Sequence, residues 1–98
     1  MNRRLRFTQA TSADIADAYS WYEAQQAGLG EEFRAELNLA FTLLSEFSEA
    51  GPAVHHNLRR LLLRRFPYAV YYRVVESGIE VRGCLHLHRD PRAWRQRG

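Results

Sequence analysis

The sequence has no lysine, one cysteine and no long hydrophobic run, and each absence excludes something. Because Cys84 is the only cysteine among 98 residues, no internal disulfide can form, and a reducing compartment such as the cytoplasm is expected. No apolar stretch is long enough to cross a bilayer or, after the basic N-terminus, to form the core of a signal peptide. We therefore expect a cytoplasmic protein without membrane association.

All 14 basic residues are arginines, and most lie late in the sequence. Residues 1–50 carry four Arg against eight acids, a formal charge of −4, whereas residues 51–98 carry ten Arg against three acids, a formal charge of +7. A guanidinium makes planar, forked contacts with carboxylates and phosphates, so the second half is expected to bind an anionic partner. A solvated basic surface, or an arginine-rich source genome, would give the same composition.

Two amphipathic helices are predicted in the first half. Thr11 is expected to cap the first, with Asp14 in the capping-box position, and an apolar stripe follows at Ile15, Tyr19 and Tyr22. The second shows a clearer period, with apolar residues at positions 33, 37, 40, 44 and 47. Only residues 28–30, Gly-Leu-Gly, separate the two, which predicts an antiparallel helical hairpin.

Strands are predicted at residues 4–7, 58–66, 69–75 and 79–88, with Pro67 and Ser77-Gly78 at the later corners. In the last strand, strict alternation gives one face for packing and one polar face. The packing face holds Ile79, Val81, Leu85 and Leu87, and the polar face holds Glu80, Arg82, Cys84, His86 and His88. The order β-α-α-β-β-β predicts an α+β fold, with the helical hairpin on one face of a small twisted, mainly antiparallel sheet. We expect one domain over residues 1–98, ending in a basic tail at 90–98.

Three motifs lie on these predicted elements. The first is Trp21-Tyr22-Glu23, then Gly28-Leu29-Gly30, then Phe33; the second is Arg65-Phe66-Pro67-Tyr68 followed by Ala69-Val70-Tyr71-Tyr72; the third is His86, Arg89-Asp90-Pro91, Trp94 and Arg97. Together, in this order, they resemble the RelE/ParE superfamily of toxins from type II toxin–antitoxin systems. The resemblance implies a small cytoplasmic prokaryotic toxin that a cognate antitoxin neutralises.

The superfamily has two activities on one fold, so the fold alone does not choose between them. ParE-like members inhibit DNA gyrase, whereas RelE-like members are endoribonucleases that cleave mRNA on the ribosome. The Phe-Pro-Tyr corner and the Arg-Asp-Pro-x-x-Trp ending are typical of the ParE-like branch, which we therefore favour. A small nucleic-acid-binding module ranks last, because no recognition-helix or RNP-type signature is present.

RNA cleavage needs groups that move protons and stabilise a charged phosphorane. RelE-like members commonly place two lysines on the strand matching residues 58–66, an arginine on the next strand, an arginine after the last strand and a C-terminal tyrosine. Here the first three positions are Arg60, Leu62 and Ala69, and the tail offers Trp94 and Arg95 but no tyrosine. Arg89 alone matches, and arginine is a poor general base. If the chain is a ribonuclease, the resemblance assigns catalysis to Arg60, His86 and Arg89.

For the favoured branch we expect a docking surface for the antitoxin or the target. Its candidate residues are Arg59, Arg60, Arg64, Arg65, Arg73, Arg89, Arg92, Trp94 and Arg95. For any one of the first four, charge protection of an edge strand is an equal explanation. No cofactor is expected. Cys84, His86 and His88 have chelating spacing, but nothing completes a tetrahedral set, so no metal site is predicted. We expect Trp21, Tyr22 and Phe33 to pack between helices and sheet, and Asp90 to order the tail by ion pairing.

Overall fold

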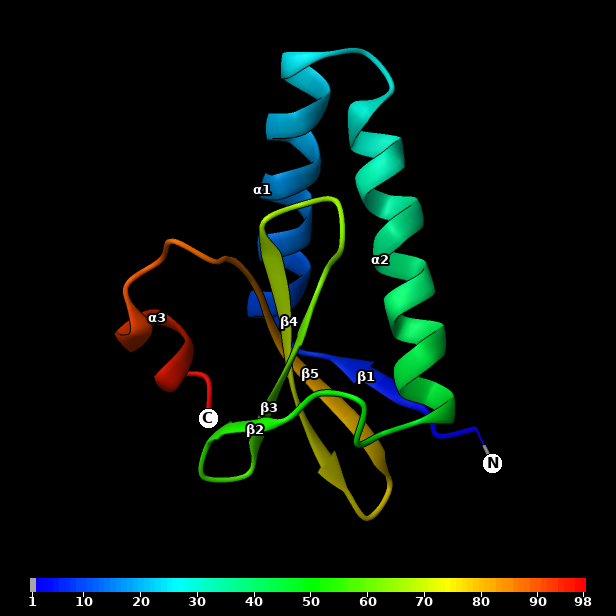
Figure 1. Cartoon of the computed structure of the whole chain (residues 1–98), viewed down its shortest axis with the longest axis vertical. Helices are drawn as coiled ribbons and strands as arrows, with labels where there is room; N and C mark the ends of the chain where they lie inside the picture. Colours follow the sequence, from blue (N-terminus) through cyan, green and yellow to red (C-terminus); the bar gives the residue numbers. More distant parts are fainter. Residues whose placement is uncertain (1) are drawn as a thin grey trace.

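The computed structural model describes residues 2–98 and contains a five-stranded sheet. The strands are β1 (Leu5–Phe7), β2 (Ala53–His55), β3 (Leu58–Leu62), β4 (Tyr68–Val75) and β5 (Gly78–His86). Their order is β1-β5-β4-β3-β2, and β1 pairs with β5 in parallel while the other pairs are antiparallel. Figure 1 shows the sheet with two long helices on one side and a short helix on the other.

The long helices, α1 (Gln9–Gln25) and α2 (Leu29–Glu46), form the predicted antiparallel hairpin. Gly28 has φ 92°, in the left-handed region that favours glycine, and it begins the reversal. The Glu23 carboxylate accepts hydrogen bonds from the N–H groups of Gly28 and Gly30 at 2.8 and 2.9 Å. A Cβ at Gly30 would lie 2.8 Å from that carboxylate, so the tight turn depends on this glycine.

The predicted fold class is confirmed: the hairpin covers one face of a mainly antiparallel sheet. β2, which was not predicted from the sequence, extends the sheet beside the start of β3. Gly51 makes this approach possible, because a Cβ there would lie 2.5 Å from the carbonyl oxygen of Arg60. The strand predicted at 58–66 is shorter, since residues 63–67 form a bend before β4. The tail contains α3 (Pro91–Arg95).

The predicted cap of the first helix was wrong. The cap is Thr8, whose hydroxyl accepts the Thr11 N–H at 3.1 Å, while the buried Thr11 hydroxyl donates to the carbonyl oxygen of Val81 at 2.9 Å. Asp14 therefore has no capping role, and its carboxylate instead accepts the backbone N–H of Cys84 at 3.0 Å. A local pattern predicted both residues at the helix start, but the contact with β5 fixes them.

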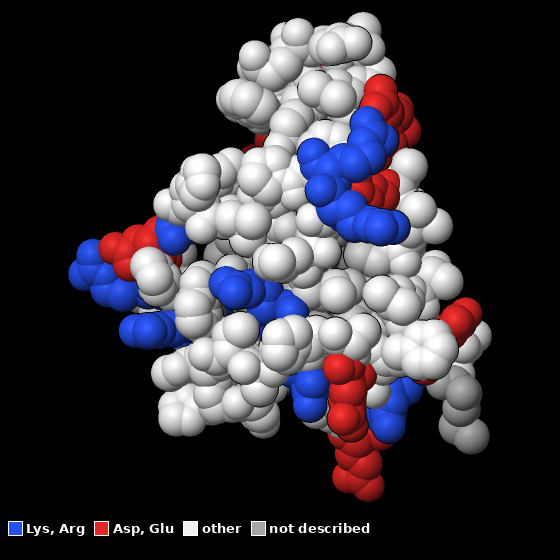
Figure 2. Space-filling view, in the orientation of Figure 1, with Lys and Arg blue, Asp and Glu red and all other residues white. Residues whose placement is uncertain are grey.

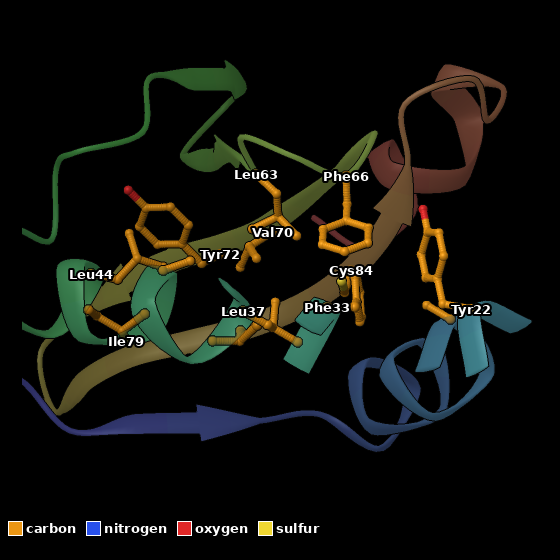
Figure 3. Packing of buried hydrophobic residues seen from close by; sticks show 13 residues of the cluster. Tyr22, Phe33, Leu37, Leu44, Leu63, Phe66, Val70, Tyr72, Ile79 and Cys84 are labelled. Carbon is orange, nitrogen blue, oxygen red and sulfur yellow. The ribbon is translucent and has the colours of Figure 1, made fainter. Parts of the chain in front are cut away.

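The main core fills the space between the hairpin and the sheet. Phe33, Leu37 and Leu44 from α2 are at most 2% exposed, as are Val70 and Tyr72 from β4. Figure 3 shows these side chains, with those of α1 and β5, pointing toward one another. Burial of each such side chain contributes about 1.5–3 kcal/mol. This confirms the predicted stripe except at its end, because Phe47 is 61% exposed. Trp21, expected to pack inside, is 58% exposed, unlike the buried Tyr22 and Phe33.

The predicted faces of β5 were also wrong beyond Val81. Tyr72 pairs with Val81 but Tyr71 pairs with Gly83, so Arg82 is an extra residue, a β-bulge. The bulge moves every later side chain to the opposite face. Cys84 therefore joins Ile79 and Val81 in the main core, and Leu85 points to the other side of the sheet.

Candidate functional site

An open groove lies between α2 and the end of β3. It encloses about 580 Å³ and is mostly apolar. Its lining residues are Glu32, Ala35, Glu36, Leu39, Ala40, Leu43, Leu61, Leu62, Leu63, Arg64 and Arg65. Leu39 and Leu62 are 72% and 51% exposed, and neither belongs to a hydrophobic cluster within residues 2–98. Large exposed apolar side chains gathered in one groove mark a place for a partner.

Charged residues also line this groove. The Glu36 carboxylate accepts the backbone N–H groups of Arg64 and Arg65, which holds the bend after β3 against α2. Arg65 also forms an ion pair with Glu32, and this hydrogen bond raises the pKa of the Arg65 guanidinium. Arg64 has no side-chain ion pair or hydrogen bond among residues 2–98, so its charge is available to a partner.

The arginines predicted to act together on residues 59–65 are divided among three places. Arg59 pairs with Tyr72 in the β3–β4 register and so lies on the hairpin side, where it donates to the carbonyl oxygen of Gly51 at 2.7 Å. Arg60 pairs with Tyr71 and so lies on the opposite face. Arg64 and Arg65 sit beyond the strand at the groove. Figure 2 shows the arginines of one face as separate patches, several of them beside acidic groups.

The face of the sheet away from the hairpin is covered by α3. Trp94 stacks on Tyr71 with ring centroids 5.7 Å apart and an interplanar angle of 11°. Leu58, Ala69 and Leu85 complete this second cluster and are at most 2% exposed. Burial raises the pKa of the Tyr71 hydroxyl, with Arg60 acting in the opposite direction.

The chain end is anchored by two residues outside the predicted site. The Arg97 guanidinium donates to the Asp14 carboxylate at 2.8 Å and to the carbonyl oxygen of Arg82 at 2.9 Å. In return, the Arg82 side chain donates to the carbonyl oxygen of Arg97. Asp14 raises the pKa of Arg97, mainly through their hydrogen bond. A Cβ at Gly83 would lie 3.0 Å from the Arg97 guanidinium, so the missing side chain at Gly83 leaves room for this anchor.

The remaining tail residues order α3 locally. Asp90 is the N-cap of α3 and forms an ion pair with Arg92 at 2.8 Å, which lowers the pKa of Asp90. Arg95 lies over the Trp94 ring, 5.4 Å from its centroid. Arg73 pairs with Glu80 in the β4–β5 register, and Glu80 forms an ion pair with Arg82.

His86 and Arg89 line a smaller cleft of about 210 Å³ between α1 and the end of β5. His86 pairs with Tyr68 in the register, and their rings are 5.2 Å apart on the hairpin side of the sheet. Arg60 lies on the opposite face, so the three residues that would carry RNA cleavage are not brought together. Burial raises the pKa of Cys84 to about 12. Within residues 2–98, no group of three metal-ligating side chains is close enough to bind an ion.

Sequence reasoning therefore missed the groove leucines, although a signal was present. Ala35, Leu39 and Leu43 follow one another at intervals of four, a second apolar stripe on α2 beside the core stripe. A helix with two apolar stripes packs on two neighbours, and within residues 2–98 nothing covers the second stripe of α2.

The arrangement of elements is shared with a solved structure described as the chromosomal ParDE TA system from P. aeruginosa. The two chains are 19% identical over 86% of this chain and 95% of that chain, with a TM-score of 0.76, which shows a common fold. A family model described as the ParE toxin of the type II toxin–antitoxin system parDE matches residues 5–91. The chain belongs to this ParE toxin family, within the RelE/ParE superfamily. No curated protein sequence matches it. Of the helices in residues 2–98, none has the length and apolar character to span a membrane.

Proposed function

We propose that this chain is a toxin that acts by binding DNA gyrase and that its cognate antitoxin neutralises it by docking in the α2–β3 groove. Cleavage of mRNA on the ribosome is the alternative. Membership of the ParE family supports a toxin role with an antitoxin partner, and the distribution of side chains favours binding over cleavage.

The main support for binding over RNA cleavage is that the sheet separates the residues that would carry out cleavage. Arg60 faces α3, whereas His86 faces α1 together with Arg89. A general base, a proton donor and a phosphate-stabilising cation must converge within hydrogen-bond reach of one phosphodiester. The Trp94–Tyr71 stack lies on the same face of the sheet as Arg60 and occupies space that a substrate there would need.

The groove suits an antitoxin segment because it combines exposed leucines with one free cation. An amphipathic helix placed along α2 would bury apolar side chains at helical spacing against Leu39 and Leu43 of α2 and Leu61 of β3. An acidic residue at its end would reach Arg64. A segment that folds on binding would explain why the second stripe of α2 is apolar yet stays uncovered within residues 2–98.

The deciding experiment compares two targets. Purified toxin is added to a gyrase supercoiling reaction and, separately, to a translating extract whose mRNA is mapped by primer extension. We expect loss of supercoiling with cleaved, linear plasmid, no new mRNA ends, and recovery of supercoiling when the antitoxin is added. Discrete mRNA cuts with normal gyrase activity would establish the ribonuclease alternative. Absence of an antitoxin reading frame beside the gene would count against the antitoxin.

A further inference from the structure

The cleft between α1 and the end of β5 is a second place where functional side chains converge. Its walls carry Asp14, Asp17, Trp21, Tyr68, His86 and Arg89. It shares no lining residue with the α2–β3 groove. Its volume, about 210 Å³, is below the range of roughly 300–1,000 Å³ usual for small-molecule sites. The cleft therefore fits one inserted side chain better than a nucleotide or a cofactor.

Three hydrogen-bond donors line the strand side of the cleft. The Nδ1 atom of His86 accepts the backbone N–H of His88 at 3.1 Å, so in the neutral ring Nε2 carries the proton and is the donor offered to a ligand. Arg89 has no side-chain hydrogen bond or ion pair within residues 2–98. The Tyr68 hydroxyl also has no hydrogen-bond partner there, and burial raises its pKa, so it keeps its proton. The three residues line one cleft, and donors gathered in this way bind an oxyanion.

The two acidic residues on the helix side differ in availability. Both oxygens of the Asp14 carboxylate are already used, one by Cys84 and Arg97 and the other by Arg97. Asp17 is exposed, one turn before Trp21. The cleft thus places its free positive charge at Arg89 and its free negative charge at Asp17. An incoming carboxylate is directed to the strand side.

Trp21 adds an apolar anchor at the rim. Its ring meets Tyr22 edge-on at 5.2 Å, yet 58% of the residue is exposed. Tryptophan, tyrosine and arginine are the residue types that dominate binding energy in protein interfaces. Trp21, Tyr68 and Arg89 bring one of each to a single cleft.

We propose that this cleft binds an aspartate or glutamate side chain of the toxin's target protein, with Arg89, His86 and Tyr68 holding the carboxylate and Trp21 covering its stem. The inference rests on the proposed function, in which the target is a protein. Because the groove is separate, the antitoxin and the cleft's ligand do not compete for the same residues.

The first test uses the gyrase supercoiling reaction with Arg89→Gln and Trp21→Ala. Each is expected to raise the toxin concentration needed for half inhibition by about 30-fold, the size typical of an interface anchor. Arg3→Gln and Phe47→Ala are matched controls, because both residues are exposed and lie outside the cleft. Their inhibition, and the affinity of all four variants for the antitoxin, should stay within about twofold of wild type.

The possible outcomes distinguish the cleft proposal from the proposed toxin function. If wild-type toxin inhibits gyrase and Arg89→Gln inhibits equally well, the cleft proposal is wrong and the toxin proposal stands. If Arg89→Gln weakens antitoxin binding as much as inhibition, the cleft belongs to the antitoxin, which also overturns the inference.

A second test holds even if wild-type toxin leaves gyrase unaffected. Sodium acetate is titrated against sodium chloride at equal ionic strength while the His86 ring signals are followed by NMR. We expect a saturable acetate-specific shift in the millimolar range that Arg89→Gln removes and Arg3→Gln keeps. Equal shifts with acetate and chloride would overturn the carboxylate site.

Discussion

Two apolar surfaces flank the core of this molecule, and one is covered by a helix whereas the other is exposed. The sheet face opposite the hairpin is closed by α3, where Trp94 and Tyr71 stack. The groove beside α2 stays open, with Leu39 and Leu62 in solvent. A surface that the chain covers contributes to its own folding, whereas one that it leaves open stabilises only a complex. We therefore expect the tail to act in folding and the groove to act in recognition.

Removing the Trp94 side chain, with which α3 covers the sheet, should have the largest effect on stability. Trp94→Ala is expected to lower the free energy of unfolding by about 3 kcal/mol, because it removes a stacked aromatic ring from the second cluster. Urea unfolding followed by circular dichroism measures it. Trp21→Ala is the matched control: as Trp21 is 58% exposed, its loss should cost about 0.5 kcal/mol or less. Equal costs for the two tryptophans would mean that α3 does not cover the sheet in solution.

A charge in the open groove should affect binding and leave folding intact. Leu39→Asp is expected to weaken antitoxin binding about 100-fold, or about 2.7 kcal/mol, since it places a carboxylate against an apolar ligand. The urea midpoint should barely move, because Leu39 is 72% exposed. Asn38→Asp introduces the same charge next to it, outside the groove lining, and should bind nearly normally. Titration calorimetry measures both affinities. If the two variants bind the antitoxin equally well, the docking surface lies elsewhere.

The anchor of the covered face should show an intermediate effect. Asp14→Asn keeps an acceptor for the Cys84 N–H but removes the charge that holds Arg97, so we expect a loss of about 2 kcal/mol in the free energy of unfolding. Trypsin should also cleave after Arg92 and Arg95 faster as α3 loosens. Asp17→Asn, one turn along α1 at an exposed site, serves as the control. If both variants are as stable and resistant as wild type, Asp14 does not anchor the tail.

The smallest effect should appear in alkaline solution. Burial raises the pKa of Cys84 from 9.0 to about 12. Because the folded pKa is the higher one, the folded state binds this proton more tightly. Its stabilisation is complete below pH 9 and is lost as the pH rises toward 12. Between pH 8 and 10 the free energy of unfolding should fall by about 1 kcal/mol more in wild type than in Cys84→Ala. Matching pH profiles would show that the thiol titrates as it does in the unfolded chain.

The sequence predicted what depends on local period and missed what depends on distant contacts. The spacing of Phe33, Leu37 and Leu44 was sufficient to predict α2 and its core face. The Thr8 cap was missed because Thr11 is fixed by a carbonyl oxygen of β5, 70 residues away. At the candidate site, the sequence named Arg64 and Arg89, but it placed His86 on the wrong face. No local pattern near residue 82 shows that Asp14 and Arg97 meet there.

The bulge at Arg82 determines which face of the sheet each later residue of β5 occupies. Because one extra residue reverses the alternation of side chains after it, Cys84 enters the core and His86 turns toward α1. Deleting Arg82 would restore strict alternation, expel the thiol from the core and swing His86 to the side of Arg60. In this fold, a single-residue insertion or deletion in one strand therefore decides whether the histidine and the arginine of β3 share a face, and the present chain keeps them apart.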